Sequence, residues 1–111
     1  MKINVLGTKY EVIIGNKKND PKLNECDGYC DESTKRIVIS DLGLFEPEVM
    51  DVEDKQVVRE RILRHEVIHA MMFESGLGHD SEWAHNEEMV DWIARQFCKM
   101  TVIFKQIGMQ I

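Results

Sequence analysis

Hydrophobic and polar positions follow a strand-like spacing in the first part of the chain. Residues 3–14 are rich in β-branched side chains and contain Gly7, which predicts one bent strand or a short hairpin about that glycine. Residues 36–40, RIVIS, are a further β-branched run and predict another strand. Residues 15–34 collect Gly, Asn, Asp, Lys, Ser and Thr, which predicts loops and turns. We therefore expect a small N-terminal sheet.

The spacing becomes helical from about residue 51. One face of the predicted helix carries residues at steps of three or four: Val58, Ile62, His65, His69 and Met72. Asp51 or Asp54 is expected to cap its start, and Gly76 stands where a glycine ends a helix. A second face is also apolar, which predicts that the helix is buried. That face consists of Val57, Ile68 and Met71.

A second helix is predicted from about Glu82 to Met100, after a tight connection at residues 77–81. Asp80 or Ser81 is the expected capping residue. The apolar positions of this helix are Trp83, Val90, Ile93, Phe97 and Met100. The sequence does not decide whether residues 101–107 extend the helix or form a strand.

The two tryptophans, Trp83 and Trp92, are interpreted as core aromatics of the second helix rather than as substrate contacts.

A length of 111 residues is near the usual size of one domain. The pattern as a whole predicts a single α+β domain over residues 1–111. Its N-terminal sheet packs on the first helix, and the second helix follows.

The composition is that of a globular chain, with 43% hydrophobic and 31% charged residues. The formal net charge is −6 and no run of Lys or Arg is long enough to follow a phosphate backbone, so we expect no nucleic-acid partner. The sequence contains no signal-peptide core and no stretch of about 20 apolar residues. We therefore expect no membrane partner and a cytoplasmic location, where the three cysteines are free thiols.

Residues 65–69 read His-Glu-Val-Ile-His, the pattern HExxH. Two histidines four positions apart on a helix lie one turn apart on the same face, where both imidazoles reach one ion. Neutral imidazole is a good ligand for Zn²⁺. Glu66, next to the first histidine, is placed to accept a proton from an attacking water. The alternative is a pair of hydrogen-bonded core histidines, but burying them among Val, Ile and Met would cost several kcal/mol unless a partner such as a metal satisfied them.

Catalytic zinc usually has three protein ligands and one open position. The chain offers several candidates for the third ligand: His79, Glu82, His85, Glu87, Glu88 and Asp91. Glu87 is preferred because Asp91 follows it by four residues and so shares its helix face. Asp91 is then expected to accept the free N–H of a ligand histidine.

These residues together resemble a known signature. His65-Glu66-Val67-Ile68-His69, followed by Asn86-Glu87-Glu88-Met89-Val90-Asp91, is similar to the HExxH motif and distal ExxxD helix of the gluzincin metallopeptidases. Over about residues 57–97 the chain looks like the small single-domain ImmA/IrrE-like peptidases and related phage or prophage zincins. The resemblance implies a zincin-like domain and a peptide or protein substrate. It also implies Zn²⁺ bound by His65, His69 and Glu87, with Glu66 as general base and Asp91 holding a ligand histidine.

The resemblance also implies that an edge strand pairs with the extended substrate, and Arg36–Ser40 is assigned to that task. The alternative is that this strand is internal. No residue matches the family's transition-state-stabilising His or Tyr with certainty, and three residues are candidates for such a donor. They are Tyr29, His79 and His85.

Other ligand sets stay open at this point. A SprT-like or other three-histidine arrangement would use His79 or His85, and Glu88 is a further alternative to Glu87. The metzincin form is excluded, because it requires Gly and His where the chain has Met72 and Ser75.

The expected function is zinc-dependent endopeptidase activity. The alternative is a zinc-stabilised, non-catalytic interaction module of phage or bacterial origin, and a third candidate is a helical protein with core histidines and no metal. Glu66 favours the enzyme, because a structural zinc site gains little from a general base and usually has a fourth protein ligand.

Overall fold

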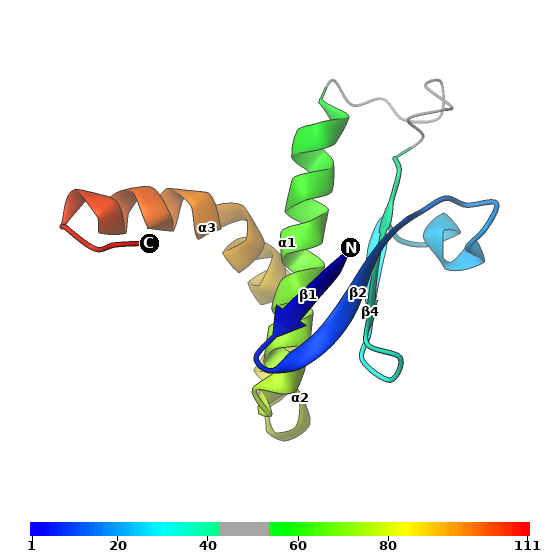
Figure 1. Cartoon of the computed structure of the whole chain (residues 1–111), viewed down its shortest axis with the longest axis horizontal. Coiled ribbons are helices and arrows are strands. Elements are labelled where there is room, and N and C mark those ends of the chain that lie inside the picture. Colours follow the sequence, from blue (N-terminus) through cyan, green and yellow to red (C-terminus); the bar gives the residue numbers. More distant parts are fainter. Residues whose placement is uncertain (43–53) are drawn as a thin grey trace.

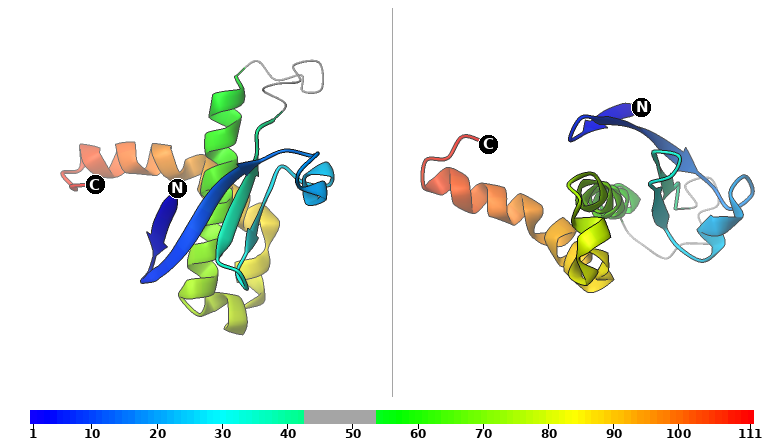
Figure 2. Two further views of the ribbon diagram at one scale, coloured as in Figure 1. Left: turned by 45° about the vertical axis from the view of Figure 1, so that its right-hand side comes forward. Right: turned by 90° about the horizontal axis from the view of Figure 1, so that it is seen from below.

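The chain folds as a small α+β domain, as the sequence predicted (Figure 1). The computed structural model describes residues 1–42 and 54–111. Within these residues a four-stranded sheet comes first, and three α-helices follow it. The sheet lies on one side of helix α1 and helix α3 lies on the other (Figure 2). Helix α1 is therefore the central element of the fold.

The first two strands form the hairpin that Gly7 suggested. Strand β1 (Lys2–Val5) pairs antiparallel with strand β2 (Thr8–Gly15). The two-residue turn between them has Leu6 at φ 50° and Gly7 at φ 98°. A turn with two positive φ angles matches the twist of an antiparallel pair. Glycine takes the second position without strain.

The region between residues 15 and 34 is more structured than the sequence predicted. It contains a 3₁₀ helix, η1 (Pro21–Asn24), and strand β3 (Gly28–Asp31). Strand β3 was missed because it has four residues, begins with a glycine and has only Tyr29 and Cys30 as non-polar positions. Its pairing with β4, rather than the intrinsic β-propensity of its own residues, stabilises this strand.

Strand β4 (Arg36–Ser40) lies inside the sheet, whose order is β1-β2-β4-β3. It pairs parallel with β2 and antiparallel with β3. The assignment of Arg36–Ser40 as the edge strand is therefore wrong, and the internal alternative is correct. The residue pattern agrees, because every residue from Ile37 to Ser40 is buried, as in strands covered on both faces. The edge on this side of the sheet is β3.

The core lies between the sheet and α1. Its buried members are Val5, Tyr10, Val12, Ile37, Ile39, Leu42, Ile62 and Ala70. On the opposite face of β4, Val38 is covered from the side of η1, where Leu23 is also buried. Burial of both faces of β4 keeps this strand inside the sheet. Its neighbour β3 therefore lies beside α1.

Helix α1 (Lys55–Glu74) begins after Asp54, whose side chain accepts a hydrogen bond from the Val57 backbone N–H at 3.1 Å. Gly76, at φ 88°, follows its last turn, as predicted. Asp51, the other expected cap, lies outside the described residues. The prediction of burial on the second face is wrong, since Val57 and Met71 are exposed. The sheet and α3 cover two sides of α1 and leave this third side open.

The second long helix starts later than predicted. A short helix, α2 (Leu77–Asp80), and a 3₁₀ helix, η3 (Glu82–His85), precede α3 (Glu87–Gln106). The cap is Asn86, whose side chain accepts from the Met89 N–H at 2.8 Å, and neither Asp80 nor Ser81 has this role. Asn is a favoured cap, and Glu87 and Glu88 in the first turn suit the positive end of the helix dipole.

The far half of α3 extends away from the body of the protein (Figure 1). Residues 101–106 continue the helix, which settles the choice left open by the sequence. Trp83 and Trp92 are 52% and 58% exposed, so their interpretation as core aromatics is wrong. Among the described residues, no element covers the side of η3 and α3 on which they lie.

Within residues 1–42 and 54–111, no helix has the length and apolarity needed to cross a membrane.

Candidate metal centre

Helix α1 places His65 and His69 one turn apart on the same face. Their Nε2 atoms are 3.2 Å apart and their ring centroids 4.9 Å apart. Together with Glu66 they offer three ligand atoms that lie within 4.8 Å of one another. The group His65, Glu66 and His69 could therefore hold a metal ion.

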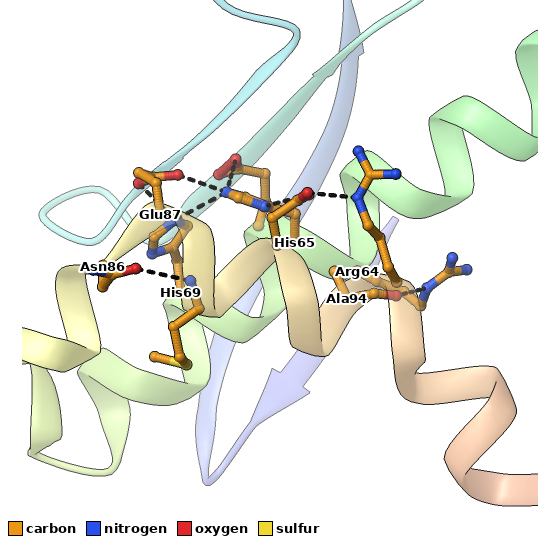
Figure 3. Close-up of polar contacts among 10 residues, drawn as sticks. Arg64, His65, His69, Asn86, Glu87 and Ala94 are labelled. Carbon is orange, nitrogen blue, oxygen red and sulfur yellow. Dashed lines mark hydrogen bonds and ion pairs between the residues drawn. The ribbon is translucent and has the colours of Figure 1, made fainter.

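Glu87, the first residue of α3, reaches both imidazoles. Its Oε2 lies 2.8 Å from Nε2 of His65 and its Oε1 lies 3.0 Å from Nε2 of His69 (Figure 3). Atoms bound at 2.0–2.1 Å around a tetrahedral zinc ion are about 3.3 Å apart. The 3.2 Å between the two Nε2 atoms is close to that value, and each Nε2 lies 2.8 or 3.0 Å from a different oxygen of the Glu87 carboxylate. The donor set therefore fits a single small divalent ion.

The carboxylate of Glu87 is ionised in this environment. Burial opposes its charge, but the two neighbouring histidines outweigh that effect and lower the pKa of Glu87 below its ordinary value. Its side chain is also 71% exposed. The charged form that a metal requires is thus favoured, and solvent reaches it.

Asp91 lies behind His65, one turn along α3 from Glu87. Its Oδ1 is 3.3 Å from Nδ1 of His65, and its Oδ2 accepts a hydrogen bond from Nε of Arg95 at 2.6 Å. The bond from Arg95, followed by the interaction with His65, lowers the pKa of Asp91. An ionised carboxylate at Nδ1 favours the tautomer that carries its proton there and leaves Nε2 free to bind a metal.

A further bond fixes α3 against α1 near this site. Nε of Arg64 donates to the backbone carbonyl oxygen of Ala94 at 2.8 Å (Figure 3). Ala94 and Val90 are both fully buried where the helices meet. Small and branched side chains at this contact let α3 approach α1 closely enough for Glu87 to reach the histidines.

Glu66 is a buried carboxyl group beside the histidines. It is 6% exposed, and its Oε1 lies 3.8 Å from Nε2 of His65. Burial raises the pKa of Glu66 to about 7, a shift that His65 partly opposes and Glu87 reinforces. A carboxyl group with a pKa near neutrality can both accept and donate a proton at physiological pH. The 3.8 Å between Oε1 of Glu66 and Nε2 of His65 is longer than the 2.8 Å between Oε2 of Glu87 and the same nitrogen. This difference distinguishes Glu66 from Glu87, the candidate ligand.

A cleft of about 450 Å³ opens in front of the site. Its walls include Glu66, His69 and Glu87 on one side and the edge strand β3 on the other. A second hollow of about 230 Å³ is also lined by Glu66 and Glu87, together with His65 and Asp91. The candidate centre thus borders two solvent-filled hollows.

Gly28 lets β3 approach α1 at this point. A Cβ atom there would lie 2.8 Å from Cγ2 of Ile62, 3.1 Å from the carbonyl oxygen of Val38 and 3.4 Å from Cγ of Glu66. Only a residue without a side chain fits this space. The sequence analysis did not single out Gly28, and the glycine at the start of a short non-polar run was the signal that could have identified it.

The structure distinguishes among the predicted ligands. It brings His65, His69, Glu87 and Asp91 together, as the sequence suggested, whereas their metal binding stays a prediction. His85 lines the cleft, but its Nε2 is hydrogen-bonded to the carbonyl oxygen of Gly78. The ring of His79 packs on Phe73, 4.7 Å away between centroids. Glu88 is exposed on another side of α3.

The three candidate oxyanion donors are also separated. Tyr29 and His85 line the cleft and His79 does not. The hydroxyl of Tyr29 donates to Asp20, a bond that raises the pKa of Tyr29 to about 12. The only O–H of Tyr29 is thus already donated to Asp20, and an oxyanion in the cleft would have to compete for it.

Comparison with protein-family models, with curated proteins and with solved structures gave no match to this chain. The assignment of a function therefore depends on the chemistry of the centre.

Proposed function

We propose that this protein is a zinc-dependent peptidase of the HExxH type. One observation carries the proposal: Glu87 of α3 reaches Nε2 of both histidines of α1, next to the buried Glu66 and an open cleft. Two imidazoles and one carboxylate are the ligand set of several catalytic zinc sites. Glu66 is the remaining protein group beside these ligands, and its Oε1 lies farther from Nε2 of His65, at 3.8 Å, than the Glu87 carboxylate does, which favours a general base over a fourth structural ligand.

Zinc is the proposed ion because its preferred ligands are present at suitable distances. His65, His69 and Glu87 would hold it, and Asp91 would orient His65 through Nδ1. When bound, a zinc ion supplies a Lewis acid that polarises a carbonyl group and lowers the pKa of water.

Glu66 is the proposed general base. Its carboxylate would accept a proton from the attacking water and then donate it to the amine that leaves the cleaved peptide. Its pKa of about 7 suits both steps. The low exposure of the side chain keeps it in one position facing the cleft.

Strand β3 is the proposed binding edge for the substrate. Among residues 1–42 and 54–111 it has a strand neighbour, β4, on one side only, and Gly28, Tyr29 and Cys30 line the cleft with Glu66. An extended peptide that added to this edge would form backbone hydrogen bonds beside the candidate centre. This transfers to β3 the function that the sequence had assigned to Arg36–Ser40.

The test measures zinc content and peptide hydrolysis for the parent protein and for Glu66→Gln. We expect the parent to bind one equivalent of zinc and to cleave unfolded protein substrates. Glu66→Gln should keep the zinc and lose about 10²- to 10⁴-fold in rate. Equal activity of the two proteins would exclude the mechanism. Zinc bound by a parent without activity would favour the non-catalytic interaction module, and no zinc in either would refute the metal centre itself.

A further inference from the structure

Helix α3 carries a largely apolar face of which, in the part of the chain that the structure describes, five members are exposed and four are half-buried. The residues along its centre, from Met89 to Ile107, follow one another at alternating spacings of four and three. Three aromatic side chains lie along its margins: Trp92, Phe97 and Phe104. The members of this face, the α3 stripe, are Met89, Trp92, Ile93, Gln96, Phe97, Met100, Ile103, Phe104 and Ile107. At 100° per residue they occupy an arc of about 140°. Val90 and Ala94, which pack on α1, lie beyond one edge of that arc.

The exposure of the α3 stripe is large for a soluble surface. Trp92, Phe97, Ile103 and Ile107 are 50–67% exposed, and Phe104 is 37% exposed. Contiguous apolar surfaces of this kind mark interaction sites. The alternating three and four spacing is the pattern that packs against another helix by knobs into holes. The expected occupant is therefore helical.

Charge is distributed unequally between this helix and the body. All 20 acidic residues of the chain precede residue 92, whereas Arg95, Lys99 and Lys105 follow it. The last 20 residues therefore carry a formal charge of +3 and the first 91 carry −9. A partner that suits the far half of α3 should present acidic surface near an apolar helix.

We propose that the α3 stripe binds the same stripe of a second copy of this chain, in antiparallel orientation. With the two-fold axis near residue 98, Ile93 faces Ile103 of the other copy and Gln96 faces Met100. Met89 then faces Ile107, so every central position meets another central position. A self-complementary patch of this kind forms a closed two-fold dimer.

Electrostatics favour the antiparallel arrangement. It directs the basic half of each α3 toward the acidic body of the other copy. The two bodies, attached near Asp91 of each helix, are then offset by about 20 Å along the axis, which is beyond the screening length of about 8–10 Å. A parallel arrangement would place both acidic bodies together and both basic halves together.

The available area is also sufficient. Side chains of this size and exposure offer on the order of 700 Å² per copy, near the ~800 Å² per partner of a standard interface. Ile103 is expected to contribute strongly, because it is 57% exposed and faces the apolar Ile93 of the other copy in the predicted contact.

The test uses two neighbouring residues of matched exposure and shape. Ile103 is 57% exposed and belongs to the α3 stripe, whereas Val102 is 56% exposed and lies on the opposite side of the helix. Sedimentation and light scattering should show a dimer for the parent and for Val102→Asp. Ile103→Asp should raise the dimer dissociation constant by about 30-fold or more. Circular dichroism of both variants checks that the helix is retained.

A second measurement tests the orientation. In a Cys98→Ser background, single variants Ile93→Cys and Ile103→Cys should form an intermolecular disulfide when mixed and not when each is alone. Cross-linking of each variant with itself would instead indicate a parallel pair and overturn the proposal. A parent that is monomeric at all concentrations would also overturn it, and binding to anionic vesicles or to another protein under those conditions would identify a different occupant.

Discussion

Asp91 Oδ1 lies 3.3 Å from Nδ1 of His65, while Nε2 of the same ring lies 2.8 Å from Glu87. One imidazole is therefore held between two carboxylates from successive turns of α3. Replacing Asp91 with Ala removes the group that orients the ring, and we expect zinc affinity to fall 10- to 100-fold. Competition with a chromophoric chelator measures this. Arg95→Ala, which removes only the partner of Asp91, should have a smaller effect, and equal effects would contradict the assigned role.

Glu87 and Glu88 provide a matched pair for the third ligand. Both are exposed glutamates in the first turn of α3, but of the two Glu87 is the one that contacts His65 and His69. Glu87→Ala should abolish stoichiometric zinc binding, and Glu88→Ala should retain it. Zinc content after dialysis measures both. Loss of zinc from His85→Ala, with retention in Glu87→Ala, would show that the ligand set includes a third histidine instead.

Gly28 should tolerate no side chain. In Gly28→Ala the new methyl group would lie 2.8 Å from Cγ2 of Ile62 and close to Glu66, so β3 must move away from α1. We expect a loss of about 1–3 kcal/mol in the free energy of unfolding, as for other overpacked sites. Urea denaturation measures it. In a double-mutant cycle with Ile62→Ala, the combined loss should be smaller than the sum, and simple additivity would exclude this contact as the cause.

Glu74 should give the protein a pH-dependent stability at acidic pH. Its carboxylate accepts hydrogen bonds from Lys35, Tyr10 and Thr8 at 2.7, 2.7 and 2.9 Å. The bond from Lys35, followed by that from Tyr10, lowers the pKa of Glu74 from 4.5 to about 2. A pKa that is lower in the folded state stabilises the protein above pH 4.5, and this contribution is lost as the pH falls toward 2.

The variant Glu74→Gln tests that statement. It should be less stable than the parent at pH 6, and the difference should shrink between pH 4.5 and 2. Thermal unfolding of both proteins across this range measures it. A constant difference at every pH would show that the ionised form of Glu74 has no special stability in the folded state.

The sequence predicted the elements that have strong periodicity and clear capping residues. Asp54 and Gly76 bound α1, and the hairpin turns at Gly7. The same reasoning missed β3, since a four-residue strand is stabilised by its pairing with β4 rather than by its own composition. The sequence analysis placed the start of the second helix at Asp80 or Ser81 and did not consider Asn86 as a cap, because residue preferences alone do not show which capping residue tertiary packing will use.

The candidate site was accessible to sequence reasoning because its spacing is local. His65 and His69 are one turn apart within α1, and Glu87 and Asp91 are one turn apart within α3. Only the meeting of the two helices had to be supplied by the fold. The edge strand was misassigned for the opposite reason, because strand order is set by long-range pairing. The apolar run Ile37–Ile39 is compatible with an internal strand, but it does not show which strands lie beside it.

The attachment of α3 near one end has a mechanical consequence. The bond from Arg64 to Ala94 fixes a pivot, with Glu87 about 10 Å to one side and Ile107 about 20 Å to the other along a stiff helix. A tilt that displaces Ile107 by about 2 Å would move Glu87 by about 1 Å in the opposite direction. Since ligand distances tolerate changes of only about 0.2 Å, a partner that tilted the distant end of α3 would also change how well Glu87 fits an ion bound by His65 and His69.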